Sequence, residues 1–345
     1  MSRPDARPTA EDAGDPLRDR DERSVASAVA SMFLRVAPGV LGVACIVVVA
    51  RWVGAGDVAA TLLSALPVLP LLITLEGARI PVEALATRML LGDDRERVPP
   101  RALFTAQFFW YALTVAMPGG RPVAEAWKAT RLAPYCGSAR AAAVAAACQA
   151  SSFAGDALIA SASAVSCYLI AGPTLLTYLI ALVAGLAVLA ALLLAALSRS
   201  DRVARLVGTV ARFRDAAAAF REAARSQSMF DPRAVVLMVL ARGLQVALFA
   251  CALGVTTAST PVALALVLQA LNMLGSIAGD LVPAQLGTTD AAFALAAGPL
   301  SAEPATMAAI AILFHAAQLA WVFFAGLAAL WTFARGPRRE STEGV

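Results

Sequence analysis

The sequence predicts an all-α polytopic membrane protein with about six to eight transmembrane helices. Hydrophobic residues make up 59% of the 345 residues and charged residues only 15%, and the mean hydropathy is +0.72. A water-soluble surface of this size does not tolerate such an apolar composition. Almost no stretch outside the apolar runs could bury a core of its own. The prediction is therefore one membrane domain with short appendages.

The first membrane half is expected at 27–197, after a disordered cytoplasmic tail at 1–26. The tail is rich in Arg, Asp, Glu and Pro, which cannot bury enough apolar surface to offset the cost of ordering. Transmembrane spans are expected at about 36–53 and 58–75. The segment 76–101 holds five arginines beside several acids, so we expect it on the cytoplasmic surface.

The rest of the first half alternates apolar and polar stretches. The apolar run 102–117 is short for a span, which takes about 20 residues. An alanine-rich helix is expected at 141–170. The uncharged turn Gly172-Pro173 then leads into a span at 174–197.

The segment 198–233 separates the two halves. It holds eight arginines, and its apolar residues recur at helical spacing, which predicts a cytoplasmic amphipathic linker helix. The second membrane half is expected at 234–334, and a basic C-terminal tail follows at 335–345. The apolar runs of the second half lie at 234–255, 262–277 and 305–333.

Two related motifs interrupt the apolar runs. The stretch 117–128 combines helix breakers with charge, and Glu125 follows Pro118 by seven residues. In the second half, Asp290 follows Pro283 by the same spacing. The repeated spacing indicates a duplicated structural device.

The positive-inside rule constrains how these motifs sit in the membrane. If every arginine-rich segment and both termini are cytoplasmic, the run 102–117 most simply enters and returns as a re-entrant hairpin. The stretch 262–300 contains no Lys or Arg, so it would enter and leave from outside. This arrangement is an inverted repeat with broken helices at the membrane centre. The alternative is that 102–117 crosses fully and 141–170 splits into two short helices.

The first motif is a candidate anion site. After the glycine pair a new helix can start at Pro122, and its free N–H groups would lie beside Arg121. A lipid phosphate could be held by the guanidinium and this helix start together. Glu125 and Lys128 follow on the same helix as further candidate substrate contacts. Alternatively, Arg121 is only an interfacial arginine at the end of a span.

The second motif offers hydrogen-bond acceptors in place of a cation. Thr288 or Thr289 would cap a helix that opens with Asp290. Thr289 and Asp290 could then meet an amino or hydroxyl headgroup, or carry a proton. Alternatively, the three residues form an ordinary N-terminal cap.

Polar residues inside apolar runs are further candidates, because they are costly to place in a membrane. Arg242 lies near the middle of its run, and an acid such as Asp156 or Asp280 is its expected partner. A purely structural ion pair is the alternative. His315 is the only histidine, and such a residue is more often a packing residue than a proton relay.

Several classes of function are disfavoured. The sequence contains no nucleotide-binding or hydrolase motif, and a single histidine excludes a two-histidine metal site, so we expect no enzyme and no cofactor. The net charge of +4 is explained by cytoplasmic loops, so nucleic-acid binding is not expected. The five scattered cysteines suggest neither metal nor disulfide; they are Cys45, Cys136, Cys148, Cys167 and Cys251.

These motifs resemble the transmembrane, flippase-like family typified by the membrane domain of lysylphosphatidylglycerol synthases and its stand-alone relatives. The resemblance covers about 36–333. In the first half it depends on the loop from Pro118 to Glu125, on Arg131 and on Asp156. In the second half it depends on the turn formed by Pro283, Gly287, Asp290 and Ala291.

The resemblance implies a multi-pass protein of the bacterial inner membrane. It implies a flippase-like transporter that moves a polar or phosphate-bearing lipid between leaflets, such as an aminoacylated phospholipid or a hopanoid. Because the chain stops after its last span, we expect no synthase activity. The alternative is a non-transporting accessory subunit that binds a lipid-modifying enzyme or a glycosyltransferase.

Overall fold

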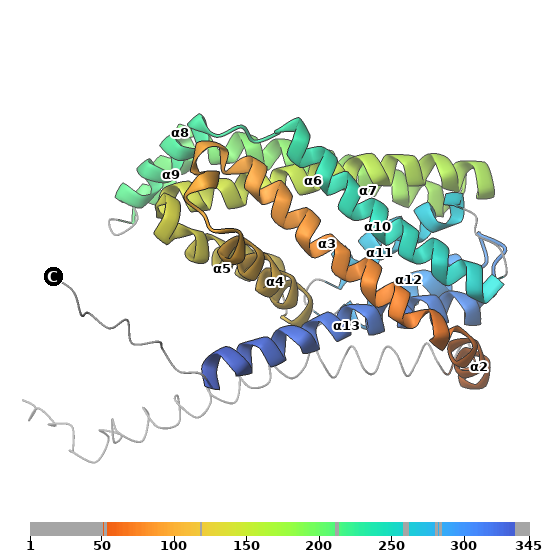
Figure 1. The fold of residues 1–345 in the computed structure, drawn as a ribbon. Coiled ribbons are helices and arrows are strands. Elements are labelled where there is room, and N and C mark those ends of the chain that lie inside the picture. The colour runs from red at the N-terminus through yellow and green to blue at the C-terminus, as the bar shows by residue number, and fades with distance from the viewer. Residues whose placement is uncertain are drawn as a thin grey trace, which may run out of the picture.

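The computed structural model describes residues 51, 54–117, 119–210, 214–257, 262–279, 282 and 285–334, and this part of the chain is helical without strands (Figure 1). The prediction of an all-α polytopic membrane protein is confirmed. Apart from Arg51, the expected span at 36–53 lies outside the described residues. Five helical runs in the described part are long and apolar enough to cross a membrane: Gly56–Leu90, Ser138–Ala171, Leu175–Ser198, Pro232–Thr257 and Pro304–Trp331.

The first of these runs corrects the prediction for 76–101. It consists of α2 (Ala55–Ala65), a short 3-10 turn and α3 (Leu69–Leu90). Glu76, Arg79 and Glu83 on α3 are buried, although we expected this segment on the cytoplasmic surface. Charged side chains can be enclosed when they pair with one another, and these three form ion pairs along one helix face. Only the 3-10 turn η3 (Gly92–Glu96) and its neighbours carry the segment's exposed charges.

The first proline motif lies at the tip of a helical hairpin. Helix α4 (Pro100–Ala116) and helix α5 (Gly120–Cys136) have 17 residues each. That corresponds to about 26 Å, which is shorter than the bilayer core of about 30 Å. Gly119 has a φ of +59°, and a side chain on Gly120 would lie only 2.5 Å from the backbone oxygen of Leu113. The glycine pair therefore permits the reversal, and α5 begins two residues before the expected Pro122.

The next two helices are long and antiparallel. Helix α6 (Ser138–Ala171) has 34 residues without a break, so the alternative that split 141–170 into two short helices is wrong. Gly172 has a φ of +71° and ends α6. Helix α7 (Leu175–Ser198) begins after Thr174, whose side chain caps it.

The linker segment contains two helices, α8 (Asp201–Gly208) and α9 (Arg214–Ser226), where we expected one. They lie at the same end of the bundle as η3 and the start of α4 (Figure 1). Arg199 donates to the Gln227 carbonyl oxygen at 2.7 Å, and Gln227 donates to the carbonyl oxygen of Leu90 at 2.9 Å. The described arginine-rich segments therefore gather at one end of the molecule.

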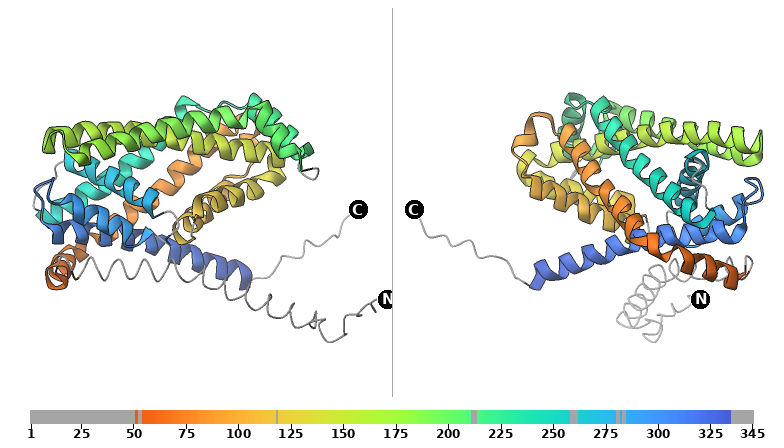
Figure 2. Two further views of the ribbon diagram at one scale, coloured as in Figure 1. Left: turned by 180° about the vertical axis from the view of Figure 1, so that it is seen from behind. Right: turned by 45° about the vertical axis from the view of Figure 1, so that its right-hand side comes forward.

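The second half contains α10 (Pro232–Thr257), α11 (Val262–Ala278), α12 (Thr288–Ala296) and α13 (Pro304–Ala334). Helices α11 and α12 form a second hairpin, in which the Thr288 hydroxyl donates to the Gly275 carbonyl oxygen at 3.2 Å. In both views of Figure 2, this light-blue hairpin and the olive α4–α5 hairpin come from opposite ends of the bundle.

The start of α12 corrects the predicted cap. The residue before the helix is Gly287, and neither Thr288 nor Thr289 caps it. Instead, Asp290 accepts a hydrogen bond from the Gly287 backbone N–H at 2.7 Å. The acid in the first turn therefore binds the N–H of the residue before the helix, and no threonine side chain caps the N–H groups within the first turn.

Candidate functional site

A cavity of about 710 Å³ lies between the two hairpins. Side chains from α3 to α7, α10, α11 and α13 line it. Its size is within the range of small-molecule sites, which span about 300–1,000 Å³. The two halves of the chain therefore build one shared site.

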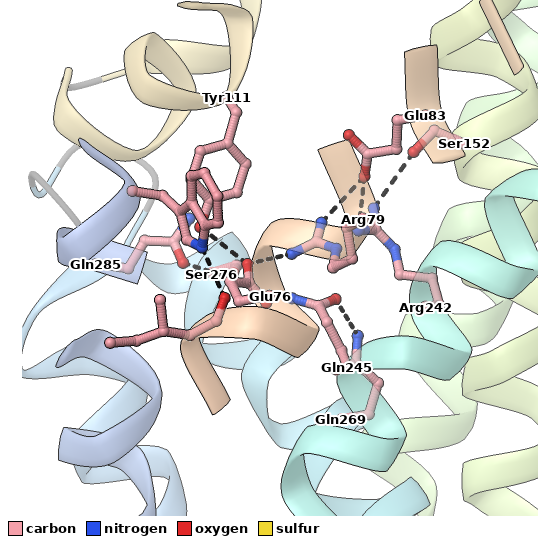
Figure 3. Close-up of polar contacts among 12 residues, drawn as sticks. Glu76, Arg79, Glu83, Tyr111, Ser152, Arg242, Gln245, Gln269, Ser276 and Gln285 are labelled. Carbon is pink, nitrogen blue, oxygen red and sulfur yellow. Dashed lines mark hydrogen bonds and ion pairs between the residues drawn. The ribbon is translucent and has the colours of Figure 1, made fainter. Parts of the chain in front are cut away.

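Paired charges on α3 form one wall of this site. Arg79 lines the cavity and lies between Glu76 and Glu83, with which it forms ion pairs (Figure 3). The Tyr111 hydroxyl donates to Glu76 at 2.9 Å, and the Gln107 side chain donates to Glu83 at 2.9 Å. These contacts fix α3 against α4 and satisfy most of the buried polar atoms.

Arg242 extends this network to two more helices. Its Nε donates to Asp156 on α6, as the sequence predicted for this arginine. Its Nη2 lies 3.3 Å from the Ser152 hydroxyl, and its Nη1 lies 3.9 Å from Glu83 on α3. Arg242 and Asp156 both line the cavity. The alternative partner Asp280 lies outside the described residues.

The first motif contributes a cation from α5. Arg121 lines the cavity, is half-buried, and lies 5.9 Å from the centre of the Phe153 ring. Among the described residues it forms no ion pair. The α5 start beside it has no side-chain cap, so its first-turn N–H groups are not occupied by a side chain.

Glu125 and Lys128 form a pair one turn further along α5. Glu125 lines the cavity and accepts a hydrogen bond from the Trp110 indole at 3.0 Å. Lys128 is 1% exposed and lies behind the cavity wall, 3.2 Å from Glu125 and 3.3 Å from the Cys148 sulfur. Lys128 therefore neutralises Glu125 and does not face the cavity.

Thr289 and Asp290 of the second motif are buried and do not line the cavity. Asp290 Oδ2 lies 3.4 Å from His315 Nε2, without the geometry of a hydrogen bond. The structure therefore brings Arg121, Glu125, Asp156 and Arg242 together at the cavity. It places Lys128, Thr289 and Asp290 behind its walls.

Several residues of the site are not predicted by the sequence pattern. Glu76, Arg79 and Glu83 were assigned to a surface segment, and Tyr111 was not singled out. A usable signal was present, because these three charges are spaced at three and four residues along an otherwise apolar stretch. At that spacing they share one helix face and can pair.

Neutral carboxamides form much of the remaining polar lining. Gln269 donates to Gln245 at 3.1 Å, and the Ser276 hydroxyl donates to Gln285 at 2.6 Å (Figure 3). The Gln269 Oε1 and Asn272 Oδ1 atoms are buried and have no hydrogen-bond partner among the described residues. These oxygens are available to a ligand that donates hydrogen bonds.

One side of the cavity is apolar. Leu186, Leu189 and Leu193 of α7 line it, yet they are 46%, 50% and 48% exposed. The same side chains thus face the cavity and the outer surface of the bundle.

Over the described ranges no three His, Cys, Asp or Glu residues are grouped to hold a metal ion.

Comparison with known proteins identifies the family. The sequence model of the lysylphosphatidylglycerol synthase TM region matches residues 27–326, which is most of the chain. No curated protein and no solved structure gives a match. Because this match covers most of the chain and the fold is polytopic and helical, the chain belongs to the family of the lysylphosphatidylglycerol synthase TM region.

Proposed function

We propose that this protein is a flippase-like transporter that moves a polar or phosphate-bearing lipid between the leaflets of the bacterial inner membrane. The observation that supports this proposal is the amphipathic character of the cavity. Charged and amide groups line its interior, while three half-exposed leucines of α7 form one side. A lipid has the same division between a polar headgroup and apolar chains.

The apolar side suggests how a lipid reaches the cavity. A headgroup that passes between the α7 leucines can enter the polar interior while its acyl chains remain in the bilayer. A charged group in the hydrocarbon core is costly, and the polar lining replaces the hydration that the headgroup loses. Transport of this kind requires no covalent step and no cofactor.

Arg121 is the proposed anchor for an anionic headgroup. Its guanidinium is not committed to an acid among the described residues, and the uncapped start of α5 lies beside it. A guanidinium and helix N–H groups together are well suited to a phosphate. Asp156 and Arg242 are proposed to contact the lipid from the opposite wall, while Glu125 orients the Trp110 indole.

The placement in the membrane follows from charge. The arginine-rich end of the bundle is proposed to be cytoplasmic, together with both termini. The α4–α5 hairpin would then enter from the cytoplasm and the α11–α12 hairpin from outside. Irregular backbone at such depth is tolerated where it faces protein or a watery cavity, as it would at the two hairpin tips.

A reconstitution experiment tests the proposal. Vesicles would contain phosphatidylglycerol with a fluorophore on one acyl chain, and dithionite would quench only the fluorophores in the outer leaflet. Vesicles with the protein are expected to lose nearly all fluorescence, while protein-free vesicles retain the inner-leaflet share. Equal residual fluorescence in the two samples, at confirmed protein incorporation, would contradict transport.

A further inference from the structure

The carboxamide side chains of this protein are concentrated at one place. The chain contains seven glutamines and a single asparagine. Six of these eight side chains line the cavity, and Gln107 binds Glu83 of the adjoining network. Only Gln227 lies elsewhere, at the end of the bundle. The six that line the cavity are Gln149, Gln245, Gln269, Asn272, Gln285 and Gln318.

This concentration requires a chemical reason, because amides are expensive in a membrane protein interior unless they are hydrogen-bonded. Two of their oxygens, Gln269 Oε1 and Asn272 Oδ1, are buried and have no partner in the described part of the chain, and these two residues are only 1% and 6% exposed. A carboxamide both donates and accepts hydrogen bonds without carrying charge. A hydroxyl group has the same capacity, so a row of hydroxyls is the ligand that these groups match.

The charged residues at the cavity also indicate which ligand it suits. The carboxylates that line it, Glu125 and Asp156, are each paired with a cation of the protein, Lys128 and Arg242. Arg121 is the cavity cation that lacks an acidic partner among the described residues. Among the described residues that line the cavity, an ammonium headgroup would therefore find amide oxygens but no carboxylate that is free of a protein cation. An anionic group would find a free guanidinium.

We propose that the lipid taken by this cavity carries a phosphate together with several hydroxyl groups, as a glycerol or sugar headgroup does, and no ammonium group. The proposal rests on the function proposed above and specifies its substrate class. Arg121 binds the phosphate, and the carboxamides of α10 and α11 bind the hydroxyls. The half-exposed leucines of α7 select a lipid over a soluble phosphorylated polyol.

A binding competition tests this assignment separately from transport. The delipidated protein would be offered equal amounts of phosphatidylglycerol and phosphatidylethanolamine with identical acyl chains, and native mass spectrometry would measure the retained lipid. The expected result is preferential retention of phosphatidylglycerol. Excess glycerol 3-phosphate is expected not to displace it; displacement would overturn the assignment to a lipid.

Two variants test whether the carboxamides cause the preference for phosphatidylglycerol. Asn272→Leu removes an oxygen that no described residue binds. The double variant Gln245→Leu with Gln269→Leu removes both members of a hydrogen bond. Each variant is expected to reduce the preference for phosphatidylglycerol over phosphatidylethanolamine. The reduction should be about fivefold for each protein–ligand hydrogen bond that is removed. Gln227→Leu is the matched control, because it removes a buried carboxamide away from the cavity and is expected to leave the preference unchanged.

The outcomes separate this inference from the proposed function. Equal retention of the two lipids, or a preference that survives in both cavity variants, would overturn the substrate class even if the protein transports lipids. A carboxamide-dependent preference supports it, also where reconstituted vesicles show no transport. In that case only the transport function would fail.

Discussion

The guanidinium of Arg242 on α10 donates to the carboxylate of Asp156 on α6, and both side chains are buried beside the cavity. Glu83 on α3 lies 3.9 Å from the same guanidinium. Arg242 thus has one acid in direct contact and a second within reach.

Loss of Arg242 is expected to destabilise the protein. Arg242→Ala leaves Asp156 buried without its cation, and breaking a buried ion pair in this way costs about 3–5 kcal/mol. Thermal unfolding in detergent, followed by intrinsic tryptophan fluorescence, should show a clearly lowered midpoint. The double variant Arg242→Met with Asp156→Leu removes both charges and should unfold near the wild-type temperature. A single variant as stable as the wild type would show that the pair is not desolvated.

Arg121 is expected to matter for transport and not for stability. Arg121→Ala removes the proposed phosphate contact, and a charge-assisted hydrogen bond contributes about 1.5–3 kcal/mol, so the rate should fall about tenfold or more. The thermal midpoint should not change, because Arg121 is only half-buried and forms no ion pair with any described residue; its guanidinium lies 5.9 Å from the centre of the Phe153 ring. Arg101→Ala is the control, since Arg101 is exposed at the start of the same hairpin. Unchanged transport by Arg121→Ala would remove this residue from the site.

The α4–α5 reversal is expected to depend on Gly120. A Cβ there would lie 2.5 Å and 2.6 Å from the carbonyl oxygens of Leu113 and Thr114. Backbone atoms cannot move aside easily, so Gly120→Ala should cost about 1–3 kcal/mol in the free energy of unfolding. Gly243→Ala is the matched control. A Cβ at Gly243, within α10, would meet nothing within 4 Å, and that substitution should stabilise the helix by up to about 1 kcal/mol.

The opposed placement of the hairpins predicts a labelling pattern. In a cysteine-free background, Arg101→Cys at the start of α4 and Val262→Cys at the start of α11 should react with a membrane-impermeant maleimide from opposite faces. Both residues are exposed. Oriented vesicles, intact and permeabilised, provide the measurement. Labelling of the two cysteines from the same face would exclude the inverted arrangement.

The α8–α9 pair is expected to loosen in acid. Asp201 accepts hydrogen bonds from Arg225, at 2.9 Å, and from Arg221. The bond from Arg225 contributes most to holding the pKa of Asp201 below its usual value. A lowered folded-state pKa means that the stabilisation is fully present above the ordinary aspartate pKa. It is lost as the pH falls through the lowered value.

Spin labels at Arg202 and Ala216 measure this change. The distance distribution between α8 and α9 should stay narrow at neutral pH and broaden at a pH below the usual aspartate range. Asp201→Asn should give the broad distribution at both pH values. A wild-type distribution that does not respond to acid would show that the ion pairs do not hold the two helices together.

Part of the site was predictable because its residues violate the apolar pattern locally. Arg242 and Asp156 stand inside apolar runs, and a buried charge must find a partner. The run Pro118-Gly119-Gly120 disfavours a continuous helix, so the first hairpin could also be anticipated. Glu76, Arg79 and Glu83 were misplaced, because a mixed polar and apolar face is equally typical of a surface helix.

The sequence by itself determined the class of the protein, the positions of α6, α7, α10 and α13, and the two interrupted segments, because hydropathy and backbone conformation are local properties. Only the tertiary structure decided which polar side chains meet. Six carboxamides from α6, α10, α11, α13 and the second hairpin tip converge on one cavity, although nearly 170 residues separate Gln149 from Gln318. Helical periodicity specifies the face on which a side chain lies. The packing of the helices alone specifies what that face meets.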